Sequence, residues 1–175
     1  MAKTSTDILI RIYPLDKTQG YYPVEAEIED GSRFDDGQLR LNVQELLQYE
    51  LDPEAYGLAL FQALFTGEML RAYEKATTIA ETESNGSLRV RFWVDEDSVE
   101  LHAVPWERMY HLHKGTPVPL SASALTPFSR STSLETSEPE PVTEEPLRLL
   151  LAVSNPKNLP ENMASVDVAG EVENI

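Results

Sequence analysis

The chain has 175 residues, a net charge of −16 and no cysteine. The acidic balance argues against nucleic-acid binding and against docking on anionic membranes, because both depend on clusters of Lys and Arg. Without cysteine, disulfides, Cys-based zinc sites and a cysteine nucleophile are excluded from this polypeptide. The first residues lead straight into a strand-like pattern with no secretory apolar region. We therefore expect a cytoplasmic protein with no cofactor, no nucleic-acid partner and no membrane partner.

The amino-terminal residues alternate between apolar and polar side chains. Residues 8–13 carry isoleucine at every second position, and residues 22–29 alternate apolar residues with glutamate in their second half. This period of two predicts strands, the second of them antiparallel with one buried and one wet face. Asp30 and Gly31 mark a turn, after which residues 39–41 are predicted to form a short third strand.

Three amphipathic helices are predicted between residues 42 and 85. Asn42 and Glu45 have the spacing of a capping box, and Asp52 followed by Pro53 is a second start signal. Gly67 separates the second helix from the third. The apolar positions predicted to face a sheet are Tyr56, Leu60, Ala63, Leu64, Met69, Tyr73, Ala76 and Ala80.

Residues 88–94 are the clearest strand of this region, with apolar residues at every second position. Their alternation places Arg89, Arg91 and Trp93 on the outward face. Residues 99–107 follow, and a helical turn opened by Pro105 is predicted to carry Trp106 and Met109 inward. Residues 110–120 are predicted to form a hairpin around Lys114, Gly115 and Thr116. Strands and helices come in blocks, so residues 1–130 are predicted to form an α+β domain with a mixed sheet and three helices.

The composition changes after this domain. Residues 131–146 are rich in Pro, Ser, Thr and Glu and are predicted to form an acidic linker. Residues 147–155 form an almost unbroken apolar run, which is typical of a strand buried on both faces of a parallel sheet. A strand with one short helix after it does not cover both faces, so residues 147–175 are predicted to be an incomplete α/β domain. Leu149, Leu151 and Val153 are then the candidate partner interface.

Other candidate sites have simpler interpretations. His111 and His113 lie two residues apart and could ligate a metal with Glu107 or Glu100. Two histidines beside a hairpin turn are more often solvated, so no metal site is predicted. Trp106 and Glu107 are interpreted as packing and capping residues. The Ser/Thr-rich residues 121–137 contain no nucleophile-elbow pattern.

Four segments in this order resemble the front part of bacterial CHAT-domain proteins, which are caspase-like cysteine peptidases. They are residues 88–94 (LRVRFWV), 100–110 (ELHAVPWERMY), 126–130 (TPFSR) and 146–156 (PLRLLLAVSNP). The resemblance implies that residues 147–175 are the first strand and helix of a caspase-like domain, whose His–Cys dyad follows that strand. His102, His111 and His113 all precede the strand, and the chain has no cysteine, so no catalytic residue is carried over.

Two functions are expected from these observations. The first is a non-catalytic N-terminal fragment, or a scaffold or regulatory subunit, of a CHAT-type peptidase. Its partner would be the C-terminal catalytic part of the same protein. The alternative is a standalone protein-interaction module of a bacterial signalling or defence system, with residues 147–153 pairing with a partner's sheet edge.

Overall fold

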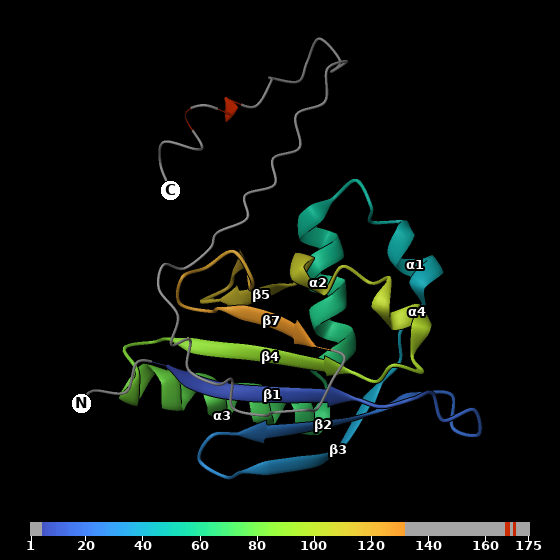
Figure 1. The fold of residues 1–175 in the computed structure, drawn as a ribbon, viewed down its shortest axis with the longest axis horizontal. Coiled ribbons are helices and arrows are strands. Elements are labelled where there is room, and N and C mark those ends of the chain that lie inside the picture. Colours follow the sequence, from blue (N-terminus) through green and yellow to red (C-terminus); the bar gives the residue numbers. More distant parts are fainter. Residues whose placement is uncertain (1–4, 132–166, 169, 171–175) are drawn as a thin grey trace, which may run out of the picture. The chain divides into compact units, whose positions relative to one another are not determined.

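The computed structural model describes residues 5–131 together with residues 167, 168 and 170 (Figure 1). The chain divides into two units, residues 1–136 and 137–175, and the fold described below is that of the first. The linker was predicted over residues 131–146, but Ser131 is the last residue of a strand. The rest of the predicted linker and the predicted interface residues Leu149, Leu151 and Val153 lie outside the described residues. The first unit is an α+β domain with a mixed sheet, which confirms the fold class predicted for it.

A five-stranded sheet runs through the domain in the order β3-β2-β1-β4-β7 (Figure 1). Pairing is antiparallel from β1 to β2 and from β2 to β3, and parallel from β1 to β4 and from β4 to β7. Ile10 of the central strand pairs with Ala26 on one side and Phe92 on the other. The strands are β1 (Thr6–Ile12), β2 (Tyr22–Ile28), β3 (Arg33–Leu39), β4 (Leu88–Val94) and β7 (Phe128–Ser131).

The predicted alternation of β1, β2 and β4 is confirmed, with one correction. Every second residue of β1 and β2 is buried, and the isoleucines of β1 are fully buried. Trp93 lies on the outward face of β4 as predicted, yet only 7% of it is exposed. Tyr13 packs edge-on against its ring at 5.5 Å between centroids. A large ring on a strand face is buried by its neighbours, so an outward position is not necessarily a wet one.

Two edge strands of this sheet differ from the prediction: β3 begins earlier than predicted, and β7 was not predicted. β3 spans Arg33–Leu39, whereas the prediction was residues 39–41. Gly37 approaches β2 so closely that a Cβ there would lie 2.6 Å from the carbonyl oxygen of Val24. β7 carries mostly exposed polar residues, so its sequence does not alternate between apolar and polar side chains. Both are edge strands, where side chains face water and the apolar signal is weak.

The three predicted helices follow β3, and the caps predicted for the first two are present. α1 (Val43–Leu47) begins where the side chain of Asn42 accepts from the backbone N–H of Gln44 at 3.0 Å. α2 (Pro53–Leu64) begins where Asp52 accepts from Ala55 N–H at 3.0 Å. α3 (Gly67–Glu83) is the longest and packs on β1, β2 and β3. Capping side chains accept hydrogen bonds from backbone N–H groups in the first turn, which have no partner within the helix.

The segment between β4 and β7 forms a small layer beside α2. It contains the short helix α4 (Val99–His102), the 3₁₀ turn η1 (Trp106–Arg108) and the hairpin of β5 (Tyr110–His113) and β6 (Thr116–Pro119). Lys114 and Gly115 both take positive φ, at 51° and 81°. Two such residues build the tight turn that joins antiparallel strands, which confirms the predicted hairpin.

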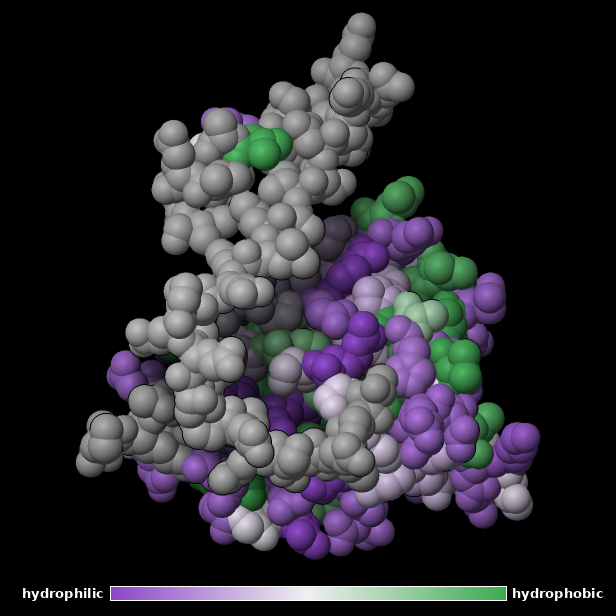
Figure 2. Space-filling view, viewed as in Figure 1, coloured by the Kyte–Doolittle hydropathy of each residue, from purple (hydrophilic) through white to green (hydrophobic). Residues whose placement is uncertain are grey.

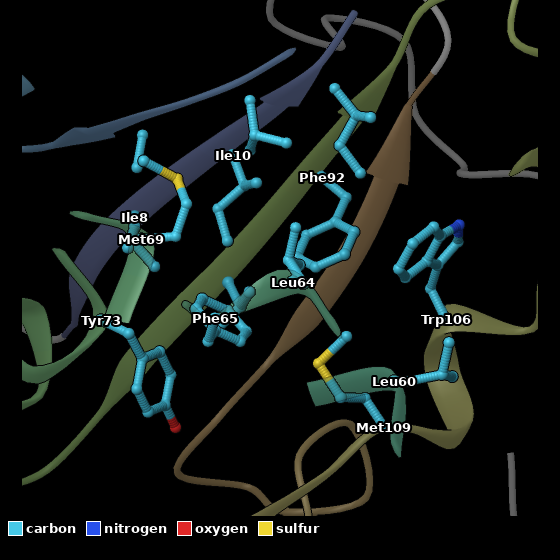
Figure 3. Close-up of a cluster of buried hydrophobic side chains, with 14 of the residues drawn as sticks. Ile8, Ile10, Leu60, Leu64, Phe65, Met69, Tyr73, Phe92, Trp106 and Met109 are labelled. Atoms are coloured by element: carbon cyan, nitrogen blue, oxygen red, sulfur yellow. The ribbon is translucent and has the colours of Figure 1, made fainter. Parts of the chain in front are cut away.

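The hydrophobic core lies between the inner face of the sheet and α2, α3 and η1 (Figure 3). Trp106 and Met109 are fully buried, as predicted. The Trp106 ring packs edge-on against Phe92 at 5.6 Å, and its indole N–H donates to the carbonyl of Leu101 at 2.9 Å. Burying an indole without a partner for its N–H would be costly, so this bond fixes the ring in place.

The opposite face of the sheet carries ion pairs. Arg11 on β1 pairs with Glu27 on β2 at 2.8 Å, and the hydroxyl of Tyr13 donates to Glu25 at 2.7 Å. Hydrophilic side chains also gather along the lower edge of the view, where β3 lies, and apolar ones gather at the right, where α1 and α4 lie (Figures 1 and 2). Among the described residues, no helix has the length and apolar character needed to cross a membrane.

Candidate functional site

The histidine pair singled out in the sequence lies on β5, and its two members have different surroundings. His111 is half-buried, and its Nδ1 lies 2.9 Å from the hydroxyl of Tyr73 on α3. His113 is exposed, with its ring centroid 6.3 Å from that of His111. One imidazole is therefore part of the packing between β5 and α3, and the other faces water.

The two glutamates considered as further metal ligands have other partners. Glu107 pairs with Arg130 of β7 at 3.5 Å, and Glu100 accepts from the hydroxyl of Tyr22. Within the described part of the chain, no group of three or more histidines and carboxylates is placed to hold a metal ion. The structure thus does not bring His111 and His113 together with Glu100 or Glu107.

The remaining candidates take part in holding the fold. His102 bonds through Nε2 to the backbone carbonyl oxygen of Asp95 at 3.0 Å. Trp106 is a packing residue, as interpreted from the sequence, and Glu107 forms its ion pair across to β7.

A groove that the sequence did not predict runs along α3, between α3 and the β5–β6 hairpin. We call it the α3–hairpin groove. It consists of three adjoining hollows that all include Tyr73, with Glu74 and Thr77 each shared by two of them. At one end α2 contributes to a mostly apolar hollow of about 330 Å³. That hollow is lined by Leu58, Phe61, Gln62, Phe65, Leu70, Tyr73, Glu74 and Leu112.

Packed rings form the floor of this groove. Phe61 and Phe65 of α2 lie 4.5 Å apart between ring centroids, and Tyr73 lies 5.2 Å and 4.8 Å from them. His111 extends the cluster at 6.0 Å from Tyr73. Tyr73 lies at the margin of the core, and its hydroxyl points away from Met69 (Figure 3). Ring pairs at these separations attract one another beyond their burial alone, which makes the floor rigid.

The polar pair in the floor is neutral near pH 7. Burial raises the pKa of the Tyr73 hydroxyl to about 12. Burial also lowers the pKa of His111 below its ordinary value of 6.5, and the nearby His113 lowers it further. Because neither group carries charge, the Tyr73–His111 hydrogen bond joins two neutral partners, and its strength is that of an ordinary bond.

The rim of the groove is acidic on the α3 side. Glu74 and Glu81 are both exposed and both line it, whereas Lys114 at the hairpin turn is the cationic residue that reaches it. Leu112 is 57% exposed and forms the apolar part of the hairpin wall. A rigid aromatic floor with an acidic rim is typical of a binding surface.

Chemical transformation has little support in this groove. The hydroxyl of Thr77 donates to the backbone carbonyl of Tyr73 at 2.9 Å, and that of Thr126 donates to Leu120. A hydroxyl that donates to a backbone carbonyl is not donating to a base, so these two threonines are not activated as nucleophiles.

The sequence contained one signal for this site. Tyr73 stood in the predicted apolar stripe of α3, and Leu112 stood between two histidines in the predicted hairpin. An exposed leucine in a short polar strand is unusual enough to be noticed. That α3 and the hairpin lie side by side followed from tertiary packing, which single-sequence periodicity does not report.

Comparisons with protein-family models, with curated proteins and with solved structures found no match to this chain.

Proposed function

We propose that this chain is a non-catalytic scaffold or regulatory part of a CHAT-type, caspase-like peptidase, whose His–Cys dyad lies outside it. The observation that carries this proposal is the state of its histidines. His102 bonds to a backbone carbonyl, His111 bonds to Tyr73, and His113 is exposed on a hairpin. A cysteine peptidase needs a thiolate beside its proton shuttle, and this chain has no cysteine.

The order of the resembling segments supports the same proposal. Residues 88–94 form β4, residues 100–110 contain most of α4 and all of η1, and residues 126–130 extend into β7. Leu149, Leu151 and Val153 are proposed to complete a sheet whose other strands belong to the catalytic part. Parallel strands are buried on both faces, so this apolar run needs further strands and helices around it.

Reading the codons after that of Ile175 in the gene tests the proposal directly. We expect the catalytic part, with its His and its Cys, to be encoded downstream. It is encoded either in the same reading frame or in an adjacent gene that specifies a companion protein. Co-expression of the two parts, followed by light scattering on the eluted peak, should give the mass of a complex. A stop codon with no companion, and a folded monomer of 175 residues, would contradict the proposal.

A standalone interaction module is the second candidate, and the α3–hairpin groove favours it. In that case the domain binds its partner through residues 5–131, and residues 147–153 serve as an additional docking strand. Deleting residues 134–175 separates the two candidates. A module keeps its partner after the deletion, whereas a peptidase scaffold loses its companion.

A further inference from the structure

We propose that the α3–hairpin groove binds a basic amphipathic helix of a partner protein. This inference rests on the proposed function only in that the chain acts by binding protein. It goes further because it names the surface, the secondary structure of the bound segment and the sign of its charge. The argument uses the lining residues of the groove, their spacing along α3 and their charges.

The groove has an apolar site at each end. One end is the hollow over Phe61 and Phe65, with Leu112 on its wall. The other end is lined in part by Leu88, Val118 and Leu125 and has a volume of about 200 Å³. Hollows of this size accept one or two large apolar side chains each, so a bound segment needs two separate apolar anchors.

The spacing of the two ends suits a helix. From Leu70 at one end to Glu81 at the other, α3 advances by about 16 Å, since each helical residue rises about 1.5 Å. A helix laid alongside α3 would present residues about seven and eleven positions apart on the same face. A helix satisfies its own backbone hydrogen bonds, so it needs only side-chain contacts from the groove.

Charge complementarity sets the sign of the partner. Glu74 and Glu81 both line the middle hollow, and each also lines one apolar end; they lie about two helical turns apart. The whole chain carries a net charge of −16, which attracts a cationic segment over a longer range. Lys or Arg placed between the apolar anchors of the bound helix would meet these carboxylates. An acidic helix of the same shape would be repelled.

Fluorescence anisotropy with designed peptides tests this inference on the full chain. The probe is a labelled amphipathic helix of about 18 residues, with leucines seven and eleven positions apart and Lys or Arg flanking them. We expect it to bind at least about tenfold more tightly than the same helix with Glu in place of Lys and Arg. A scrambled peptide of the same composition, which keeps the charge and loses the leucine stripe, controls for general attraction to an acidic protein.

Variants locate the binding to the groove. Leu112→Ser is expected to weaken binding of the basic helix at least about tenfold, and Glu74→Gln with Glu81→Gln to reduce both its affinity and its salt dependence. Leu51→Ser and Glu54→Gln are the matched controls, because Leu51 is 98% exposed and both residues lie outside the groove lining. The circular dichroism of each variant checks that it folds.

Three results would overturn the inference. They are equal binding of the basic and scrambled peptides, equal binding of the basic and acidic helices, and unchanged binding by Leu112→Ser. The companion predicted under the proposed function gives an independent readout. If Leu112→Ser binds the basic helix as the parent does, yet the companion is lost when residues 134–175 are deleted, the groove inference fails and the proposed function stands.

Discussion

The two faces of the five-stranded sheet show how the same strands carry two kinds of interaction. On the inner face, the isoleucines of β1 and the alternate residues of β4 are buried under α2, α3 and η1. On the outer face, side chains of β1 and β2 form ion pairs such as Arg11–Glu27. Apolar burial is worth far more than a half-exposed ion pair, so stability should depend on the first face and tolerate change on the second.

The α3–hairpin groove combines buried core residues with residues exposed to water. Phe65 and Tyr73 belong to the core and are 4% and 6% exposed, yet they also form the groove floor. A surface that shares residues with the core is held rigid by it. Because these residues are already held in place, a bound segment would cost less conformational entropy in the groove, which favours binding there.

Trp106→Ala should produce the largest loss of stability and would confirm the weight of the inner layer. The side chain is fully buried, packs on Phe92 and donates a hydrogen bond to Leu101. Truncation leaves a cavity and an unpaired carbonyl, so we expect a loss of about 3–5 kcal/mol in the free energy of unfolding, measured by urea denaturation. Leu51→Ala, at a nearly fully exposed position, should change it by less than about 0.5 kcal/mol.

Gly57→Ala tests the close packing of α2 against the layer that follows it. A Cβ at Gly57 would lie 2.3 Å from the carbonyl oxygen of Arg108 and 2.5 Å from Cδ2 of Tyr110. Alanine favours a helix over glycine by about 1 kcal/mol, but the clash is with backbone. We expect a net destabilisation of about 1–3 kcal/mol in urea unfolding.

The exposed position Gln62 on the same helix is the matched control for this change. Gln62→Ala should leave the free energy of unfolding within about 0.5 kcal/mol of that of the parent. A stabilised Gly57→Ala variant would show that propensity outweighs packing at this contact, and that α2 is free to move away from η1.

Acidification probes the groove margin through His111. Its pKa in the folded protein is below 6.5, chiefly because of burial, so the unfolded chain binds the proton more tightly. The stability that this group contributes is present above pH 6.5 and is lost as the pH falls below that value. The urea concentration at the unfolding midpoint should therefore decrease as the pH is lowered from about 7.5 to about 5.5.

His111→Gln should flatten this pH dependence. Carboxylates with lowered pKa, such as Glu27 and Glu100, lose their contributions only as the pH falls below their ordinary value of 4.5. The interval from pH 7.5 to 5.5 thus lies above the range in which these carboxylates lose their contributions. An identical slope in parent and His111→Gln would show that this contact is not sensitive to protonation.

Glu27→Gln on the outer face should have the smallest effect. The guanidinium of Arg11 holds the pKa of this carboxyl below its usual range, yet 30% of the glutamate side chain is exposed. We expect a loss of about 0.2–1 kcal/mol that shrinks at high salt, measured by urea unfolding at two ionic strengths. A loss as large as that of Trp106→Ala would erase the distinction between the two faces.

Periodicity and capping chemistry determined most of the domain in advance. Because alternation and side-chain caps are local, β1, β2, β4, the start of α2 and the β5–β6 hairpin could be predicted from the sequence alone. Edge strands give a weaker signal, since one of their faces and one of their edges meet water. For that reason β3 was misplaced and β7 was missed.

Tertiary structure alone decided which elements became neighbours. It paired β4 with both β1 and β7, joined Tyr73 to His111, and gave Glu100 and Glu107 partners far from the histidines. Contacts between residues distant in sequence depend on how whole faces pack, and no local pattern encodes them. The sequence thus determined the building blocks and their buried faces, and packing determined the groove.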